Sequence, residues 1–433
     1  MLNTRKLGLN DKEKNTFRLH AIYASIEGII LGVLALNEFV FLKSLQGTNY
    51  QLGVLFQFSM LVFLFLFFVN EFIKRTSNRK KLLRIAAILT RLPLIALFFF
   101  PRTAEAMDAA SIYHYVFLGI FLIYYCGNIV IYPNINYLLK INYRHEHFGT
   151  LYSYSSTINK LIMLVVTFVY GLLLDQDHYA FVYVFPVVAI LGVVSVFILS
   201  EIKYPEDIID KSKGILESVK ESARGMIQIL KKNVPYRDFE LGFMFYGMAF
   251  MITNPIIYIY FYEKLDLNYT SVAFYRNSYN ILAILILPFF GKLMGKIDPR
   301  KFGIITYTSL GLYIFFLAIT SAFPYYIDLY NIRLYYTLIS YILFHGVFAA
   351  TMVLLWNIGS AYFCKPEESG TYQSIHLFLT GSRAVFAPLI GVVIYEIAGF
   401  GITFGISLFL VLMSIFTMIW SYRREKKLKQ HAK

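Results

Sequence analysis

Cysteine and charged residues are scarce in this chain. Its two cysteines among 433 residues, Cys126 and Cys364, fall in or at the end of different apolar segments, so neither a disulfide nor a structural metal site is expected. Charged residues make up 15% of the chain and hydrophobic residues 58%. This balance excludes a water-soluble fold, because such a fold cannot cover that much apolar surface. The chain is therefore expected to lie in a lipid bilayer.

Several marks of enzymes are also missing. No glycine-rich phosphate loop of the Walker type is present, which excludes ATP hydrolysis at such a loop. The run His145-Glu146-His147 is a poor metal site, because helix neighbours one and two residues apart do not converge on one point. No extracytoplasmic connection is long enough for an ectodomain. We therefore expect no cofactor, no metal and no enzymatic activity, and any chemistry must occur within the membrane.

Apolar segments of membrane length dominate what is present. A spanning helix needs about 20 predominantly apolar residues. The pattern predicts twelve spans, at 18–43, 50–72, 82–100, 113–139, 148–174, 179–202, 238–262, 270–290, 302–323, 333–362, 370–395 and 399–421. An even number of spans places both termini on the same side. The first segment is much longer than the apolar core of a signal peptide and is not followed by an A-x-A-like site, so it is expected to remain as a helix.

The net charge of +14 is distributed unevenly. Lysine and arginine outside the spans concentrate in the tails and the even-numbered connections. The odd-numbered connections hold only Lys43, Arg102, Lys264 and Arg333. By the positive-inside rule both termini are expected in the cytoplasm, and the expected location is the cell (inner) membrane. The basic clusters are then orientation signals and contacts to membrane lipids, and nucleic acid is not an expected partner.

The sequence is duplicated, with landmarks that recur about 220 residues apart. Asn49-Tyr50 recurs as Asn268-Tyr269, and Gly149-Thr150 recurs as Gly370-Thr371. The duplication predicts two pseudo-symmetric six-helix bundles. Their predicted bounds are 1–202 and 238–433, joined by a cytoplasmic linker at 203–237 that contains an amphipathic helix. Two related halves favour a transporter that works by alternating access around a site between them.

A second duplicated stretch carries a family resemblance. Residues 70–79 (NEFIKRTSNR) return as 291–300 (GKLMGKIDPR), and these loops resemble the G-x-L-x-D-R-x-G-R-R pattern of the major facilitator superfamily. The resemblance implies an all-α integral membrane protein with 12 transmembrane helices in the major facilitator fold. It also implies that these loops hold the two halves in the outward-open state. The residues that fit the pattern, and that are therefore predicted to act in gating, are Arg75, Arg79, Gly291 and Arg300. Neither copy keeps the acidic residue of the pattern, and the helix 5 motif of drug antiporters is absent.

Two cations are predicted near the middle of the bilayer. Charge at that depth is costly and therefore indicates function. Lys160 in span 5 and Arg383 in span 11 lie on equivalent helices of the two repeats, a geometry suited to gripping an anion. Each belongs to a polar face of its helix. The predicted substrate-binding residues are Lys160, Arg383, His376, Arg276, Asn134, Asn357, Tyr152 and Tyr372. The alternative is that these polar faces only join the halves by interhelical hydrogen bonds.

Other ionisable residues suggest proton coupling. Glu27 is the only acid deep in span 1 and is the first predicted proton carrier; a permanent salt bridge with Lys160 or Arg383 is the alternative. His345 in span 10 is the next, with a packing role as its alternative. Glu240, near the inner end of span 7, is expected to reach water. Arg91 in span 3 is expected to pair or to extend toward the interface. Gly28 and Gly32 form a GxxxG pattern in span 1 that predicts close helix packing.

The leading interpretation is a secondary active transporter, a monomer, for a small anionic or zwitterionic organic solute coupled to protons. The cations outnumber the deep acid, which motivates the sign of the substrate. One alternative is an exporter or flippase of an amphipathic or lipid-linked substrate. An alternative of another class is an integral membrane transferase that uses His345 or His376.

Overall fold

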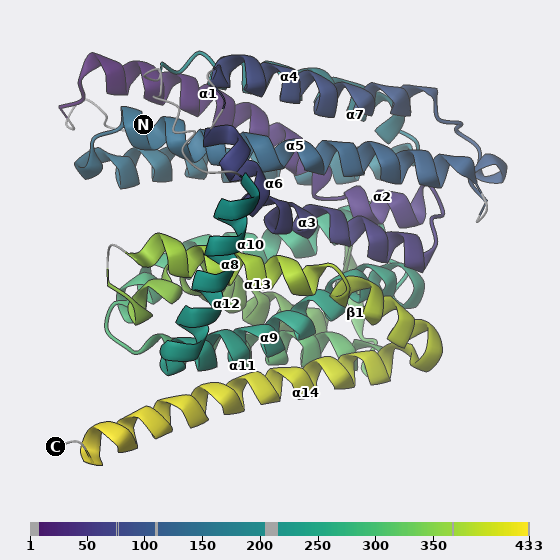
Figure 1. The fold of residues 1–433 in the computed structure, drawn as a ribbon. Coiled ribbons are helices and arrows are strands. Elements are labelled where there is room, and N and C mark those ends of the chain that lie inside the picture. The colour runs from purple at the N-terminus through teal and green to yellow at the C-terminus, as the bar shows by residue number, and fades with distance from the viewer. Residues whose placement is uncertain are drawn as a thin grey trace. The chain divides into compact units, whose positions relative to one another are not determined.

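The computed structural model describes residues 8–74, 76, 78–108, 111–203, 215–365 and 368–431, and almost all of them are helical (Figure 1). The chain divides into two compact units. Unit 1 contains Met1–Gln51 and Phe65–Ile215, and unit 2 contains Leu52–Leu64 and Leu216–Lys433. The helix α3 (Asn49–Lys74) contributes to both.

Unit 1 consists of long apolar helices with short connections. Its elements are α1 (Asp11–Leu34), α2 (Asn37–Lys43), α4 (Arg79–Arg91), η2 (Leu92–Phe99), η3 (Ala104–Met107), α5 (Ile112–Asn142), α6 (His145–Gln176) and α7 (Phe181–Leu199). The change from α4 to the 3₁₀ helix η2 coincides with Pro93, whose missing N–H ends the α-helical hydrogen bonding. Asn10 caps α1 by accepting from the backbone N–H of Glu13 at 2.8 Å.

Unit 2 repeats this pattern. Its elements are α8 (Ile215–Lys232), α9 (Val234–Ile259), η4 (Tyr260–Lys264), α10 (Tyr269–Met294), α11 (Pro299–Ala318), η5 (Ile319–Ser321), β1 (Tyr326–Leu329), β2 (Ile332–Tyr335), α12 (Tyr336–Ile358), η6 (Ser360–Phe363), α13 (Ser369–Ala384) and α14 (Ala387–His431). The long α14, yellow in Figure 1, is interrupted at Gly399, whose φ of 76° lies in the region that favours glycine. The helix α8 lies within the stretch predicted as the linker.

The helices account for all predicted spans. Ten segments among the described residues are long and apolar enough to cross a membrane. One of them, Thr371–Leu428, contains the last two predicted spans on either side of Gly399. The helix α3 covers the predicted span 50–72. The twelve predicted segments are thus helical, and the protein is a multi-pass membrane protein.

The start of the tenth predicted span is wrong by a few residues. Residues 332–335 form β2, which pairs antiparallel with β1 in a hairpin, and the helix begins at Tyr336. Tyr330 at the turn has a φ of 53°, and β-branched and aromatic residues on either side favour strands. The hairpin and the turn before α10 line a polar pocket of about 330 Å³.

Glycines on α1 set the packing within unit 1. A Cβ added at Gly28 would lie 2.6 Å from the carbonyl oxygen of Asn159, and one at Gly32 would lie 2.7 Å from the Cβ of Val166. Both contacts are with α6, and both are too short for a methyl group. The prediction of close helix packing at this GxxxG pattern is confirmed.

Candidate functional site

One face of α9 lies along one face of α13 in unit 2. The hydroxyl of Tyr236 donates to the carbonyl of Tyr372 at 2.8 Å, and the carboxylate of Glu240 binds the ring of His376; each pair is 136 residues apart. Because the separation stays constant along the chain, the two helices run parallel. The paired positions follow helical spacing, so they form a continuous contact along the interior of the unit.

Arg383 lies two helical turns beyond His376 and is 1% exposed. Its Nη1 donates to the carbonyl of Phe243 at 2.6 Å, and its Nη2 donates to the hydroxyl of Thr380 at 3.4 Å. The ring of Tyr246 lies 5.4 Å from Cζ. Within the described part of the chain, Nε has no hydrogen-bond partner and no carboxylate forms an ion pair with this guanidinium. Arg383 is therefore a buried cation whose hydrogen-bond partners are neutral.

The guanidinium has room because residue 247 has no side chain. A Cβ added to Gly247 would overlap Cζ, Nη2 and Nε of Arg383. Gly247 lies on the same face of α9 as Glu240, at the residue that corresponds to Arg383 in the helix pair. The glycine thus forms the wall against which the guanidinium rests.

Glu240 and His376 form a buried ionisable pair. The Nδ1 atom of His376 lies 3.0 Å and 3.1 Å from the two carboxylate oxygens of Glu240. The residues are 1% and 3% exposed. The expectation that Glu240 reaches water is wrong, because the imidazole covers the carboxylate and aromatic rings enclose both. The His376 ring contacts Phe243 at 4.4 Å and Trp356 at 5.0 Å, each nearly edge to face.

Unit 1 has its own polar core around Glu27. The hydroxyl of Ser195 donates to the Glu27 carboxylate at 2.8 Å. Arg91 is the cation that interacts electrostatically with Glu27, and it also donates to Asn128 Oδ1 at 2.8 Å and to the carbonyl of Tyr124 at 3.1 Å. Arg91 was expected to pair or to extend toward the interface; it is buried and hydrogen-bonded within its unit, so it does not extend toward the interface. Glu27 therefore has a nearby cation within its own unit, contributed by α4.

The predicted substrate residues of unit 1 differ in exposure, since Asn134 is buried and Lys160 and Tyr152 are exposed. Lys160 is exposed in its unit and has no hydrogen-bond or ion-pair partner among the described residues. Tyr152 is 42% exposed and stacks on Phe148 at 5.9 Å. Asn134 donates to the carbonyl of Val130 on its own helix, and its Oδ1 has no partner in the described part of the chain. The structure thus gives these three residues different surroundings.

In unit 2 the remaining predicted residues occupy separate places. The ring of His345 is stacked between Tyr279 at 3.6 Å and Tyr313 at 4.3 Å. Its Nδ1 has no hydrogen-bond partner among the described residues.

Three other predicted residues of this unit, Arg276, Asn357 and Tyr372, form hydrogen bonds with nearby groups. Arg276 donates to the hydroxyl of Tyr258. Asn357 is exposed and donates to the carbonyl of Val353. The hydroxyl of Tyr372 accepts from Asn233 at 3.0 Å. Of the predicted substrate residues, the structure brings Arg383, His376 and Tyr372 onto one helix face.

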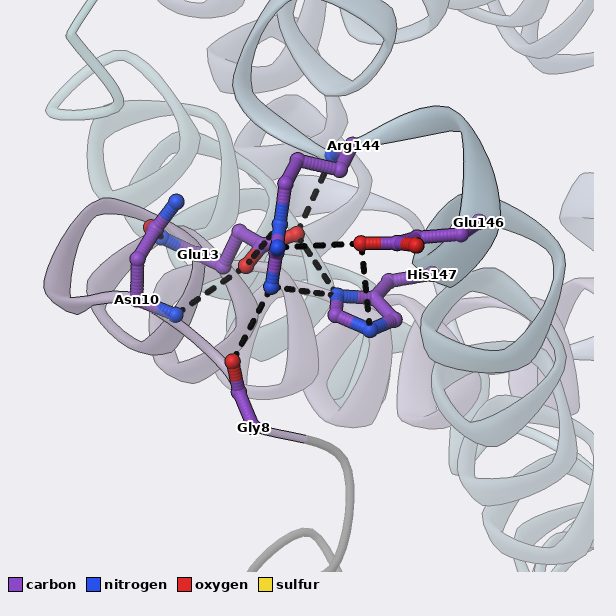
Figure 2. A network of polar contacts seen from close by, with 6 residues as sticks. All are labelled: Gly8, Asn10, Glu13, Arg144, Glu146 and His147. Carbon is purple, nitrogen blue, oxygen red and sulfur yellow. Dashed lines mark hydrogen bonds and ion pairs between the residues drawn. The ribbon is translucent and has the colours of Figure 1, made fainter.

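A charged network joins the start of α1 to the start of α6 (Figure 2). The Glu13 carboxylate, whose side chain is fully buried, accepts from the backbone N–H of Asn10 at 3.1 Å and from Nε of Arg144 at 3.2 Å. It also lies 2.9 Å from Nδ1 of His147. Arg144 extends the network to Glu146 at 2.9 Å. His147 thus contributes to an ion-pair network, and the side chain of His145 lies outside the described part.

The predicted gating residues have different surroundings. Arg75 lies outside the described residues. Arg79 is buried with its Cζ 3.8 Å from the centre of the Tyr137 ring. Arg300 forms ion pairs with Asp298 at 2.8 Å and with Glu425 at 2.6 Å.

Gly291 has open space around its Cα, because a Cβ added there would meet no atom within 4 Å among the described residues. A glycine is therefore not required at this position for packing within the unit.

Only the α13 side of the α9–α13 contact was predicted from the sequence. The sequence pattern placed His376 and Arg383 on one face of the later helix but did not identify the partners Glu240 and Gly247. A signal was present, since residues 236, 240 and 247 on α9 have the same helical spacing as 372, 376 and 383 on α13. Matching the polar faces of helices that run in the same direction would have paired them.

Comparisons with known proteins agree with this architecture. The family profile described as the Major Facilitator Superfamily matches residues 20–334 and 242–433. A search of curated protein sequences gives no match.

Several solved structures are similar over most of the chain. A mutant of the nucleoside transporter NupG aligns with a TM-score of 0.68 and 12% identity, covering 95% of this chain and 100% of that chain. The peptide transporter POT in complex with sulfate aligns with a TM-score of 0.64 and 13% identity, covering 95% of each chain. The xylose transporter XylE from E. coli aligns with a TM-score of 0.62 and 11% identity, covering 94% of this chain and 97% of that chain. These identities show a shared fold. With the family match over most of its length, the chain belongs to the major facilitator superfamily and is a membrane transporter, not an enzyme.

Proposed function

We propose that the protein is a secondary active transporter that moves a small anionic or zwitterionic organic solute by alternating access, coupled to protons. It acts as a monomer in the inner membrane with both termini in the cytoplasm. Arg383 on α13 is the proposed anion-binding cation of unit 2, and Lys160 on α6 is the predicted substrate-binding cation of unit 1. The observation that carries the proposal is the buried Arg383 guanidinium, which no carboxylate in the described residues pairs with.

A buried charge is costly unless it is paired. The Nη groups of Arg383 donate to a carbonyl and a hydroxyl, and its Nε has no partner in the described part of the chain. A carboxylate or phosphate would supply the missing negative charge and accept from the planar fork of the guanidinium. A substrate anion thus stabilises a group that the folded protein leaves incompletely compensated.

Lys160 is the second cation predicted to contact the substrate. It lies on α6, the counterpart of α13 in the first repeat, and is exposed in its unit. The sulfate bound to the peptide transporter among the similar structures supports the view that this fold accommodates an anion. Tyr152, Asn134, Arg276 and Asn357 remain predicted contacts, and Glu27 and His345 remain predicted proton carriers.

Ligand-dependent thermal stabilisation tests the sign of the substrate. The purified protein is melted with succinate, glycerol 3-phosphate, glutamate, xylose or choline, because a ligand that binds the native state raises its apparent stability. We expect the anions and glutamate to raise the melting temperature more than xylose or choline does. Arg383→Gln should lose this response, and Arg383→Lys should recover part of it because the fork is missing. Arg224→Gln, an exposed change on α8, is the matched control.

Two outcomes would contradict the proposal. The first is that anions stabilise the protein no more than the neutral sugar and the cation do. The second is that Arg383→Gln melts at a lower temperature but keeps the full anion response, which would make Arg383 a structural residue. Proton coupling is tested with the most stabilising anion in proteoliposomes, where a pH gradient should drive its accumulation and a protonophore should abolish it.

A further inference from the structure

The Glu240–His376 pair has an atom that is free to take up a proton. An ionised carboxylate only accepts hydrogen bonds, so the hydrogen between Glu240 and His376 is on Nδ1 when the imidazole is neutral. The other ring nitrogen, Nε2, is buried and has no partner among the described residues. A proton can therefore add at Nε2 while Nδ1–H stays bound to the carboxylate. The ring then carries a positive charge beside Glu240.

We propose that Glu240 and His376 form the proton-binding site of this transporter, and that a proton held there favours anion binding at Arg383. This inference rests on the proposed function. It assigns coupling to a residue pair in α9 and α13 in place of Glu27 or His345, and it assigns His376 to the proton in place of the substrate.

The link to Arg383 is electrostatic. Glu240 interacts with the Arg383 guanidinium as well as with His376. With a neutral imidazole, the negative charge of Glu240 offsets the charge of Arg383 and competes with an anion. When His376 takes up a proton, the imidazolium neutralises Glu240, and the full positive charge of Arg383 becomes available to the substrate. Proton and anion thus bind together, which is the thermodynamic requirement for symport.

The surroundings of the pair contain no second acid among the described residues that interact with it. The titratable and charged groups that face it come from three helices. They are Tyr236 and Tyr246 on α9, Tyr307 on α11, and Tyr372 and Arg383 on α13. Tyrosines stay neutral near physiological pH. The imidazole is therefore the group in this cluster suited to change charge in that range.

The two other candidates have different environments. Glu27 accepts a hydrogen bond from Ser195 and has the permanent cation Arg91 nearby, but no imidazole among the described residues contacts it. His345 lies between two tyrosine rings, and no described carboxylate pairs with it. Of these three candidates, the Glu240–His376 pair is the one that combines an acid, an imidazole and a ring nitrogen with no partner among the described residues.

Trp356 provides a direct reporter of this site. Its ring lies 5.0 Å from the His376 ring, and a protonated imidazole quenches indole fluorescence more strongly than a neutral one. The chain contains two tryptophans, so Trp420→Phe leaves Trp356 as the single tryptophan, which is excited selectively at a wavelength where tyrosine does not absorb. The emission of purified Trp420→Phe protein is titrated from about pH 5 to about pH 9, with and without sulfate or succinate at constant ionic strength.

We expect emission to fall as the pH falls, with one midpoint. Adding His376→Gln should remove the transition. Adding Glu240→Gln should lower the midpoint by about 1–3 pH units, because the opposite charge that favours the imidazolium is gone. Sulfate or succinate should raise the midpoint, by the reciprocity of linked binding, and Arg383→Gln or Arg383→Lys should reduce that rise. Glu201→Gln, an acid in an exposed ion pair with Lys80, is the matched control and should leave the curve unchanged.

Three results would overturn the inference. The first is a transition that persists in the His376→Gln protein, which would place the titrating group elsewhere. The second is a midpoint that neither anion moves, although the same anion raises the melting temperature, which would refute the linkage while the proposed function stands. The third is loss of the anion effect in Glu27→Gln but not in Glu240→Gln, which would make Glu27 the carrier. Failure of the proposed function would be distinguished by the thermal melting experiment, in which no anion would then stabilise the protein.

Discussion

The contact between Gly247 and Arg383 allows a sharp test of how the guanidinium is held. In Gly247→Ala the new methyl group would overlap the guanidinium, so Arg383 must move away from the Phe243 carbonyl, to which it donates at 2.6 Å. A hydrogen bond from a charged group contributes about 1.5–3 kcal/mol. Alanine in place of glycine within a helix contributes about 1 kcal/mol in the opposite direction. The net expectation is a loss of about 0.5–2 kcal/mol in the free energy of unfolding.

A double-mutant cycle isolates the contact. In the Arg383→Ala background the methyl group meets no guanidinium, so Gly247→Ala should stabilise the protein by about 1 kcal/mol. The sign of the effect thus reverses between backgrounds, and the coupling energy should be about 1.5–3 kcal/mol. The four proteins are compared by denaturant titration in mixed micelles, and their anion response is measured by thermal melting. Equal effects of Gly247→Ala in both backgrounds would refute the reasoning, because the methyl group would then act independently of Arg383.

Three further predictions concern stability. Gly32→Ala should lower the free energy of unfolding by about 1–3 kcal/mol, because its methyl group would press on α6. Gly119→Ala, where no described atom lies within 4 Å of the added Cβ, should raise it by up to about 1 kcal/mol; the opposite order in melting temperature would contradict this packing. Glu13→Gln should lower the free energy of unfolding by about 1–3 kcal/mol, because the fully buried carboxylate of Glu13 accepts several hydrogen bonds. The control Glu146→Gln, at a side chain that is 63% exposed, should change this free energy by less than about 1 kcal/mol. Equal losses in the two variants would contradict the burial argument. Burial acts to raise the pKa of Asp298, but hydrogen bonds from an arginine outweigh it and hold that pKa below its usual value. The Asp298 carboxylate therefore stabilises the fold above its ordinary pKa, and this contribution is lost as the pH falls through its pKa in the folded protein. The melting temperatures of the native protein and Asp298→Asn should converge as the pH is lowered. A difference in melting temperature that stays constant with pH would refute this.

Some residues of the candidate site could be identified before folding. Arg383 and His376 stand on one helical face at membrane depth, and the cost of burying charge there singles them out. Glu240, the acid that pairs with His376, was expected to reach water, because counting residues from the end of a helix gives the depth of a side chain but not the direction in which it points. Similarly, Arg91 was expected to find a partner, but its identity as the cation near Glu27 depends on where α1 and α4 meet.

The sequence by itself determined the membrane class, the twelve apolar segments, the duplication and the family. These properties follow from the period and length of apolar runs and from the bias of positive charge, all of which are local along the chain. It also determined that glycines on α1 permit a close approach. Only the tertiary structure decided which face of α9 meets which face of α13. Residues 136 positions apart come into contact only through the packing of whole helices, where a small rotation of one helix selects different partners. This packing places Glu240 against His376, and it places Gly247, which has no side chain, where Arg383 needs space.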